Sequence, residues 1–268
     1  MIEQALTIAG SDSGGGAGIQ ADLKTFHAHG VFGASVVTAI TAQNTVAVTR
    51  AFDLPVDLIE AQLDAVFDDL DIAAAKTGML SSVEIVETVA GVLKRRGFDQ
   101  LVVDPVMISK SGYKLLKDDA VESVKIRLLP LALVVTPNIH EAELLSGLRI
   151  DSAEKMKEAA RRIHGFGPRS VLVKGGHAAF NEAADLLFDG ERFHTFMSEF
   201  IDTKNTHGTG CTYSAAITAR LALGEPLLTA VGKAKTYITR AIRHSLAIGK
   251  GHGPTNHFYF LRPDDFLK

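Results

Sequence analysis

The chain has 268 residues, of which 46% are hydrophobic and 22% are charged, and its formal net charge is −3. It is long enough to bury a large core in one or two domains, and its interspersed charges show no basic patch for nucleic acid or an anionic membrane. The N-terminus lacks a signal-peptide pattern, and no apolar run approaches the ~18 residues that cross a bilayer, so we expect a cytoplasmic protein. Cys211 is the sole cysteine and cannot form an internal disulfide.

Apolar, strand-like runs alternate with helical patterns along the chain. Strands are expected at 4–10, 34–40, 72–76, 101–104, 132–136, 170–174, 184–188 and 192–197. Helices are expected after residue 16 and at 55–70, 82–95, 118–129, 139–146, 152–164, 210–222 and 226–247. Runs such as Leu101-Val102-Val103 are continuously apolar, as a parallel sheet covered by helices requires. With no linker or repeat, the pattern predicts one doubly wound α/β domain over residues 1–268.

Polar residues directly follow the apolar runs at almost every expected strand end. They are Gly10-Ser-Asp-Ser, Gln43-Asn44, Lys76-Thr-Gly-Met79, Asp104-Pro-Val-Met107, Thr136-Pro-Asn138 and Lys174-Gly-Gly-His177. Ligands of doubly wound sheets bind beyond the carboxyl ends of the strands. The sequence therefore predicts that these segments contribute to one site.

The glycine loop after the first strand, Gly14-Gly-Gly-Ala-Gly18, has two interpretations. It suggests phosphate binding, but it lacks the Gly-Lys-Ser/Thr of a P-loop, and Ile19 stands where a dinucleotide fingerprint has its last glycine. Alternatively, it is a tight turn that brings backbone close to a neighbour. Asp22 is either a solvated helix residue or a first-turn carboxylate that faces a ligand.

The segment Asn205-Thr-His-Gly-Thr-Gly-Cys-Thr212 carries the strongest single signal, because it opens an alanine-rich helical pattern. Small residues at a helix N-terminus leave backbone N–H groups pointing outward at the positive end of the helix dipole. Fixed donors of this kind suit phosphoryl transfer, which depends on positioning and charge stabilisation. The segment predicts an anion hole, with an ordinary helix cap by Asn205 or Thr206 as the alternative.

Cys211 lies within this segment and has three interpretations. It is a buried, inert small hydrophobe, or it pairs with His207 as the nucleophile of a hydrolase. In the third interpretation the helix N-terminus lowers its pKa, and the thiolate accepts or orients the proton of an attacking alcohol.

Two carboxylates and a lysine complete the candidates. Asp104 and Glu141 are expected to organise Mg²⁺, directly or through water, because this ion prefers oxygen ligands and retains several waters. Lys174 ends an apolar strand, where a phosphate partner removes the cost of an unpaired charge. The ten histidines show no recognisable metal-ligand spacing.

Taken together, these motifs resemble the ribokinase-like superfamily, and within it the bifunctional hydroxymethylpyrimidine and phosphomethylpyrimidine kinases of thiamin biosynthesis. The match extends to the C-terminal Gly251-His-Gly-Pro254 and Asn256-His-Phe258. The resemblance implies a three-layer α/β/α fold with a mostly parallel sheet, and a homodimer. It also implies that ATP and Mg²⁺ are used to convert 4-amino-5-hydroxymethyl-2-methylpyrimidine to its monophosphate and then to its diphosphate.

The same resemblance assigns roles by motif. Gln43 is expected to hydrogen-bond the aminopyrimidine, in a pocket lined by Gly10, Asp22, Met79 and Val106. Lys174, Thr206 and Asn205 are expected to bind ATP, and the catalytic segment consists of Gly208, Thr209, Gly210 and Cys211. The cysteine stands where the superfamily usually has an aspartate base. Ser13-Gly14 replaces the Pro-Ser common in the family and removes no proposed ligand.

Three alternatives stay open: a pyridoxal or pyridoxine kinase, a non-catalytic ligand-sensing module, and the Cys211/His207 hydrolase. Gln43 and the Lys174-Gly-Gly-His177 motif favour the pyrimidine enzyme over a pyridoxal kinase, and the set Asp104, Glu141, Lys174 and Cys211 argues against a sensor. Only the first phosphorylation starts from a neutral alcohol that must lose a proton. Cys211→Ala is therefore expected to slow the first step more than the second.

Overall fold

The computed structural model describes residues 2–108, 112–113, 115–176 and 184–261, so His177 lies outside the described residues. The strands of the described chain are β1 (Gln4–Asp12), β2 (Phe32–Gln43), β3 (Val48–Asp53), β4 (Ile72–Thr77), β5 (Leu101–Val103), β6 (Val134–Val135), β7 (Val171–Val173), β8 (Asp185–Phe188) and β9 (Phe193–Phe196). Its α-helices are α1 (Gly18–Ala28), α2 (Val56–Asp69), α3 (Val83–Arg95), α4 (Asp118–Ser123), α5 (Ile139–Ser146), α6 (Ala153–His164), α7 (Thr209–Ala222) and α8 (Leu227–Arg243).

These strands form one nine-stranded sheet in the order β3-β2-β1-β4-β5-β6-β7-β8-β9. The strands from β2 to β7 in this order are parallel, whereas β3, β8 and β9 pair antiparallel with their neighbours. The chain leaves β1 toward β2 on one side and later returns to place β4 on the other. The strand order therefore reverses beside β1, which is the position where doubly wound sheets bind ligands.

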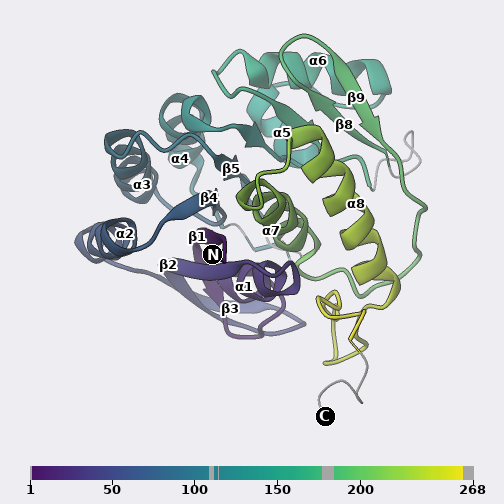
Figure 1. Ribbon diagram of the computed structural model, residues 1–268. Coiled ribbons are helices and arrows are strands. Elements are labelled where there is room, and N and C mark those ends of the chain that lie inside the picture. The colour runs from purple at the N-terminus through teal and green to yellow at the C-terminus, as the bar shows by residue number, and fades with distance from the viewer. Residues whose placement is uncertain (1, 109–111, 114, 177–183, 262–268) are drawn as a thin grey trace.

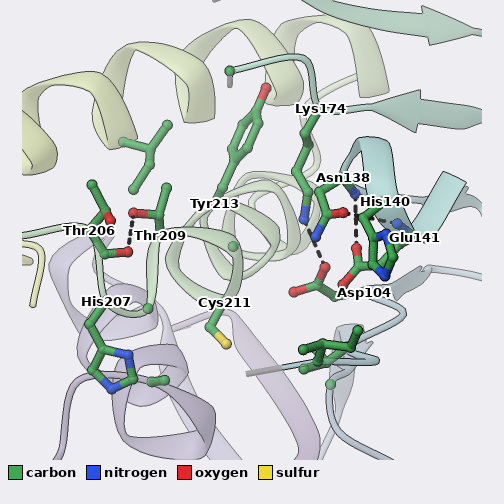
Figure 2. Close-up of a pocket in the computed structure, with 18 of the residues that line it drawn as sticks. Asp104, Asn138, His140, Glu141, Lys174, Thr206, His207, Thr209, Cys211 and Tyr213 are labelled. Carbon is green, nitrogen blue, oxygen red and sulfur yellow. Dashed lines mark hydrogen bonds and ion pairs between the residues drawn. The ribbon is translucent and has the colours of Figure 1, made fainter. Parts of the chain in front are cut away.

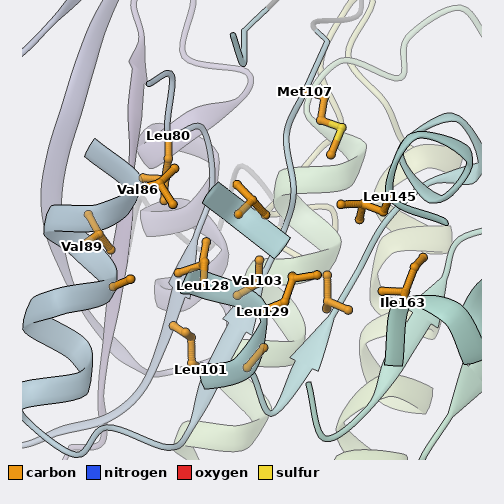
Figure 3. Packing of buried hydrophobic residues seen from close by; sticks show 14 of the residues in the cluster. Leu80, Val86, Val89, Leu101, Val103, Met107, Leu128, Leu129, Leu145 and Ile163 are labelled. Carbon is orange, nitrogen blue, oxygen red and sulfur yellow. The ribbon is translucent and has the colours of Figure 1, made fainter. Parts of the chain in front are cut away.

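Helices cover both faces of the sheet (Figure 1). Side chains from α2, α3, α5 and α6 join the larger hydrophobic cluster, part of which Figure 3 shows, and α1, α7 and α8 supply the other. Successive strand residues point to opposite faces, so Leu101 and Val103 of β5 enter the first cluster and Val102 enters the second. Each such buried side chain contributes about 1.5–3 kcal/mol of transfer free energy. This explains the continuously apolar strands and confirms the three-layer α/β/α architecture.

Three elements differ from the sequence expectation. Strand β3 was not expected, because it lies at the sheet edge and of its residues only Val48 is buried. The expected helix 118–129 divides into α4, a π turn over Val124–Leu128 and a 3₁₀ turn around Pro130, which cannot continue a regular helix. The expected helix 226–247 ends at Arg243, and the Leu246 amide instead donates to the Pro254 carbonyl at 2.9 Å.

Within the described residues, no helix combines the length and the apolar character that crossing a membrane requires.

Candidate active site

The carboxyl ends of the central strands open onto a cavity of about 1200 Å³. Most of the residues predicted for the site line it, namely Gly10, Gln43, Met79, Asp104, Val106, Glu141, Lys174, Thr206, Gly208, Thr209, Gly210 and Cys211. Figure 2 shows Lys174, Asp104 and Glu141 together on one side of this pocket, with Cys211 and His207 on the other. Segments far apart in the sequence thus meet at one edge of the sheet, as their strand-end positions predicted.

The glycine loop after β1 folds around the carboxylate of Asp12. The amides of Gly14, Gly16 and Ala17 donate to this carboxylate at 2.7, 3.0 and 2.8 Å. Burial alone would raise the pKa of Asp12, but the hydrogen bond from His207 and these amides holds it below its ordinary value. Clustered backbone donors of this type form an anion-binding nest. Here a side chain of the same loop occupies the nest, which supports the tight-turn interpretation of the loop.

The second glycine-rich loop, residues 205–211, packs directly on the first. Gly208 has a φ of +76°, and a Cβ added to it would collide with the Gly16 carbonyl oxygen. A Cβ on Gly16 would in turn collide with the His207 ring. Both positions therefore require glycine, one of them also for its backbone conformation.

Helix α7 begins at the cavity without a capping side chain, because its N-cap residue is Gly208. The Thr209 amide donates to the Thr206 carbonyl at 3.3 Å, whereas the next amides, of Gly210 and Cys211, belong to the first helical turn, which lacks intrahelical acceptors. Lys174 Nζ lies 3.5 Å from the position that a Cβ on Gly210 would occupy. Backbone donors and an ammonium group thus face the same small volume, which suits a phosphoryl group.

Asp104 is held in place by three side chains. Its Oδ1 accepts hydrogen bonds from Lys174 Nζ at 3.0 Å and from Thr136 Oγ1 at 3.2 Å, and its Oδ2 accepts one from Ser214 Oγ at 3.1 Å. Burial alone would raise its pKa, but the ammonium groups of Lys174 and Lys76 hold the pKa of this carboxyl below its ordinary value. Asp104 is therefore a fixed, ionised carboxylate at the cavity wall.

Glu141 begins helix α5 beside Asp104. Its Oε2 accepts a hydrogen bond from the backbone N–H of Asn138 at 2.8 Å, and Asn138 Oδ1 accepts one from the backbone N–H of Glu141 at 2.9 Å. These two hydrogen bonds form a capping box. Burial, with a further contribution from the charge of Asp104, raises the pKa of Glu141 to about 7 despite the opposing charge of Lys174. The two carboxylates repel each other when both are ionised, and a divalent cation bound here would relieve this repulsion.

Cys211 is partly buried in the cavity wall, and burial raises the pKa of its thiol to about 12. Lys76 and the Gly18 amide lower this pKa, but they do not overcome the effect of burial. The interpretation of Cys211 as a thiolate with a lowered pKa is therefore wrong for this structure. The hydrolase interpretation also loses support, because the His207 ring donates to Asp12 at 3.0 Å and lies apart from Cys211 in Figure 2.

Two residues predicted for the site do not line the cavity among the described residues. Asp22 is fully buried, and its Oδ2 accepts hydrogen bonds from Thr7 Oγ1 at 2.6 Å and from Lys76 Nζ at 2.9 Å. It supports the wall through Lys76, which does line the cavity. Asn205 Oδ1 instead accepts the Gly253 amide at 3.2 Å and so holds the C-terminal segment in place.

Sequence reasoning missed roles for Asp12, Lys76 and Ser214. Lys76 stood in a strand-end motif, and that position was the signal that it faces the site. Ser214 carried no comparable signal, because its contact with Asp104 joins residues that lie far apart in the sequence.

The phosphomethylpyrimidine kinase family model matches residues 12–256 of the chain. The chain is 52% identical to the hydroxymethylpyrimidine/phosphomethylpyrimidine kinase of Haemophilus influenzae, over 97% of this chain and 98% of that protein. It is 53% identical to the thiamine biosynthesis bifunctional protein ThiED of Geobacter sulfurreducens, over 94% of this chain, and spans about half (51%) of that longer protein.

Two solved structures show the same ribokinase-like fold. The phosphomethylpyrimidine kinase of Clostridium difficile has 50% sequence identity and a TM-score of 0.81, with 90% of this chain and 100% of that chain covered. An ADP complex of Bacillus subtilis pyridoxal kinase has 42% identity and a TM-score of 0.91, with 97% and 99% covered. The length and identity of these matches agree with the motifs at the strand ends and with the placement of the cavity, and the chain belongs to the phosphomethylpyrimidine kinase family.

Proposed function

We propose that this chain transfers the terminal phosphoryl group of ATP to the hydroxymethyl oxygen of 4-amino-5-hydroxymethyl-2-methylpyrimidine. A second transfer then converts the monophosphate to the diphosphate used in thiamin assembly. The proposal is carried by the convergence of Lys174, Asp104 and the uncapped start of α7 on one cavity, in a member of a kinase family. In each step an O–P bond forms at the acceptor, the bond to ADP breaks, and ADP leaves.

The acceptor binds at the end of the cavity near β1. Gln43 contributes an amide there, and Gly10, Met79 and Val106 contribute small or apolar surface. A Cβ on Gly10 would lie only 2.9 Å from Met79 Cε, so the absence of a side chain at Gly10 leaves room for Met79 in the wall. A flat heterocycle fits an apolar surface with a few fixed polar groups.

The nucleotide occupies the opposite arm of the cavity. Phe200, Ile201, Ile238 and Ile242 line the cavity and would provide an apolar surface for the adenine. Lys174 and Thr206 face the phosphates, and the amides of α7 stabilise the transferring group. The related pyridoxal kinase from B. subtilis was solved with ADP, which supports nucleotide binding in this fold.

Magnesium fits the two carboxylates but not a dedicated protein cage. Within the described residues, no cluster of three or more His, Cys, Asp or Glu side chains could enclose a metal ion. Mg²⁺ keeps several waters and binds through one or two carboxylates and substrate phosphates. Asp104 and Glu141 are the residues that would hold it, and the ion would neutralise charge on the nucleotide. The homodimer and the cytoplasmic location stay predictions.

Cys211 positions the acceptor in this proposal. A thiol with a pKa of about 12 is protonated at neutral pH and can donate a hydrogen bond, whereas it cannot serve as an efficient base. A loose transition state needs little deprotonation of the alcohol before the phosphoryl group arrives. The alcohol proton can therefore leave late in the transfer, to an oxygen of the transferred phosphoryl group or to water.

Pyridoxal kinase activity is the second candidate, because the B. subtilis pyridoxal kinase shares 42% identity and a TM-score of 0.91 with this chain. The deciding experiment measures ADP release with Mg-ATP and each acceptor separately: the hydroxymethylpyrimidine, its monophosphate, and pyridoxal. Turnover of both pyrimidines well above pyridoxal supports the proposal. Preference for pyridoxal moves the assignment to the second candidate, and no turnover with any acceptor favours a ligand-sensing module.

A further inference from the structure

A chain of hydrogen bonds crosses the acceptor end of the cavity and joins both glycine-rich loops. His207 Nε2 lies 3.0 Å from Asp12 Oδ2 and 3.4 Å from Gln43 Nε2. The other end of this side-chain amide, Gln43 Oε1, lies 3.2 Å from Thr41 Oγ1, which also donates to the Ser11 carbonyl at 2.9 Å. The amide of Gln43 therefore has a protein partner on each side.

The Asp12 contact fixes what His207 can offer to Gln43. The Asp12 carboxylate already accepts the amides of Gly14, Gly16 and Ala17, and an ionised carboxylate can only accept. His207 Nε2 must therefore carry the proton that it donates to Asp12. A protonated ring nitrogen cannot accept a hydrogen bond, so toward Gln43 it can act only by sharing the same N–H in a bifurcated hydrogen bond. The Gln43 group that faces His207 favourably is consequently the carbonyl oxygen.

The Thr41 contact leads independently to the same orientation. A hydroxyl has one hydrogen, and Thr41 Oγ1 uses it for the Ser11 carbonyl. Toward Gln43 this oxygen can therefore only accept, and the group that satisfies it is the NH₂ of the amide. In the structure Gln43 Nε2 faces His207 and Oε1 faces Thr41, so this pairing requires the carboxamide to be turned by 180°. Such a turn exchanges oxygen and nitrogen without moving the plane of the group.

We infer that His207 is a positioning residue for acceptor specificity, which orients the Gln43 amide with its carbonyl toward His207 and its NH₂ toward Thr41. The backbone of His207 is itself fixed, because its N–H donates to the Gly253 carbonyl at 3.0 Å and its carbonyl accepts the Thr255 amide at 3.3 Å. The ring is also mostly buried, with 8% of the residue exposed. Asp12 and the backbone together therefore hold the His207 ring that orients Gln43.

This orientation has a consequence for the ligand. Gln43 keeps one N–H and one carbonyl lone pair that neither Thr41 nor His207 uses, and their order in space is fixed. An aminopyrimidine presents an amino donor beside a ring-nitrogen acceptor and matches a fixed donor–acceptor pair. Pyridoxal, aligned by its hydroxymethyl group, presents a formyl group in place of the amino donor and a hydroxyl in place of the ring-nitrogen acceptor. The inference rests on the proposed function, because it assumes that Gln43 contacts the heterocycle.

A double-mutant cycle tests this inference in the full-length protein, with KM for the pyrimidine and for ATP measured separately. H207A is expected to raise the pyrimidine KM about tenfold, the effect of losing one oriented hydrogen-bonding partner, while the ATP KM changes by less than about twofold. H207Q keeps an N–H donor of similar reach and should recover most of the loss. In a Q43A background H207A should change the pyrimidine KM by less than about twofold, because its effect passes through Gln43.

His252 supplies a matched control. His252 precedes Gly253 on the C-terminal segment, and its Nδ1 lies 2.9 Å from the Lys204 carbonyl oxygen. Unlike His207, it is not among the described residues that line the cavity. H252A should leave the pyrimidine KM unchanged. An equal rise in H252A, failure of H207Q to recover, or a tenfold effect of H207A that persists in Q43A would each overturn the inference.

The wild-type protein separates this inference from the proposed function. Wild-type turnover of the pyrimidine combined with an additive cycle overturns only the role of His207. If the wild type shows no turnover, the same double-mutant cycle is measured as the dissociation constant of the pyrimidine by calorimetry. A wild-type chain that neither binds nor phosphorylates the pyrimidine overturns both.

Discussion

Replacing Lys76 with methionine tests the buried ion pair beneath the cavity wall. Lys76 Nζ lies 2.9 Å from Asp22 Oδ2, and both side chains have 0% exposure. Asp22 Oδ2 also accepts the Thr7 hydroxyl, whereas Asp22 Oδ1 has no hydrogen-bond partner within the described structure. The substitution keeps the apolar stem but leaves the Asp22 carboxylate with one neutral donor. Breaking a buried pair in this way costs about 3–5 kcal/mol, because the remaining charge is uncompensated.

Urea unfolding of four proteins at pH 7.5 measures this effect: the wild type, K76M, D22L and K76M/D22L. K76M is expected to lower the free energy of unfolding by about 3–5 kcal/mol, and the double variant should be more stable than the sum of the single effects predicts. The reason is that replacing both charges removes two desolvation costs together. Midpoints and slopes must be fitted separately, since a changed slope reports altered exposure on unfolding.

The Arg95–Glu60 pair provides the surface control. Its side chains are 57% and 44% exposed, so R95M should cost less than about 1 kcal/mol. A cost of K76M no larger than that of R95M, or strictly additive effects of K76M and D22L, would refute the reasoning that an unscreened charge pair supports the cavity wall.

Three further predictions concern residues that line the cavity. Gly208→Ala should lower kcat more than tenfold with both acceptors, because a Cβ there collides with the first glycine loop. Gly224 is the control, since it has the same φ of +76° but open space around it. Gly224→Ala should therefore lower only the free energy of unfolding, by about 1–2 kcal/mol. Because the Cys211 thiol has a pKa of about 12 and acts as a positioning group, the rate of the first phosphorylation should not change from pH 7 to 9. Cys211→Ala should lower the rates of both phosphorylations by similar factors. A rate that rises nearly tenfold per pH unit, or a selective loss of the first phosphorylation, would restore the thiolate base. The pKa of Glu141 is raised to about 7, so between pH 4.5 and 7 the folded state holds a proton that the unfolded state, with its ordinary pKa of 4.5, releases. The free energy of unfolding without magnesium should therefore fall by at most about 3 kcal/mol as the pH rises to 7. Melting temperatures from pH 4.5 to 7.5 measure this loss, Glu141→Gln should abolish it, and parallel curves for the two proteins would contradict the assigned pKa.

The position of the site could be predicted because it follows from strand direction. Asp104 and Lys174 are 70 residues apart, yet each directly follows an apolar strand, and the carboxyl ends of parallel strands meet at one edge of the sheet. Their 3.0 Å contact is therefore a consequence of a pattern visible in the sequence. Strand β3 had no such pattern, because an edge strand whose residues stay mostly exposed needs no continuous apolar run.

The protonation state of Cys211 could not be predicted in the same way. The sequence shows that the cysteine stands in the first turn of a helix, where the dipole favours a thiolate. It does not show how much protein surrounds the sulfur, and this desolvation is the largest influence on its pKa. The two effects oppose each other, and only the three-dimensional environment decides between them.

The two glycine-rich loops show why similar local sequences acquire different roles. Both expose backbone N–H groups, but Asp12 occupies the donors of the first loop, whereas Gly208 leaves the start of α7 without a capping side chain. The Asp12 carboxylate would repel a phosphoryl group transferred nearby if its charge were not balanced. His207 donates to this carboxylate at 3.0 Å, and Asp12 shares its charge with the amides around it. The first loop is thus closed to phosphate and can pack against the second, which leaves the start of α7, beside Lys174, as the candidate anion site.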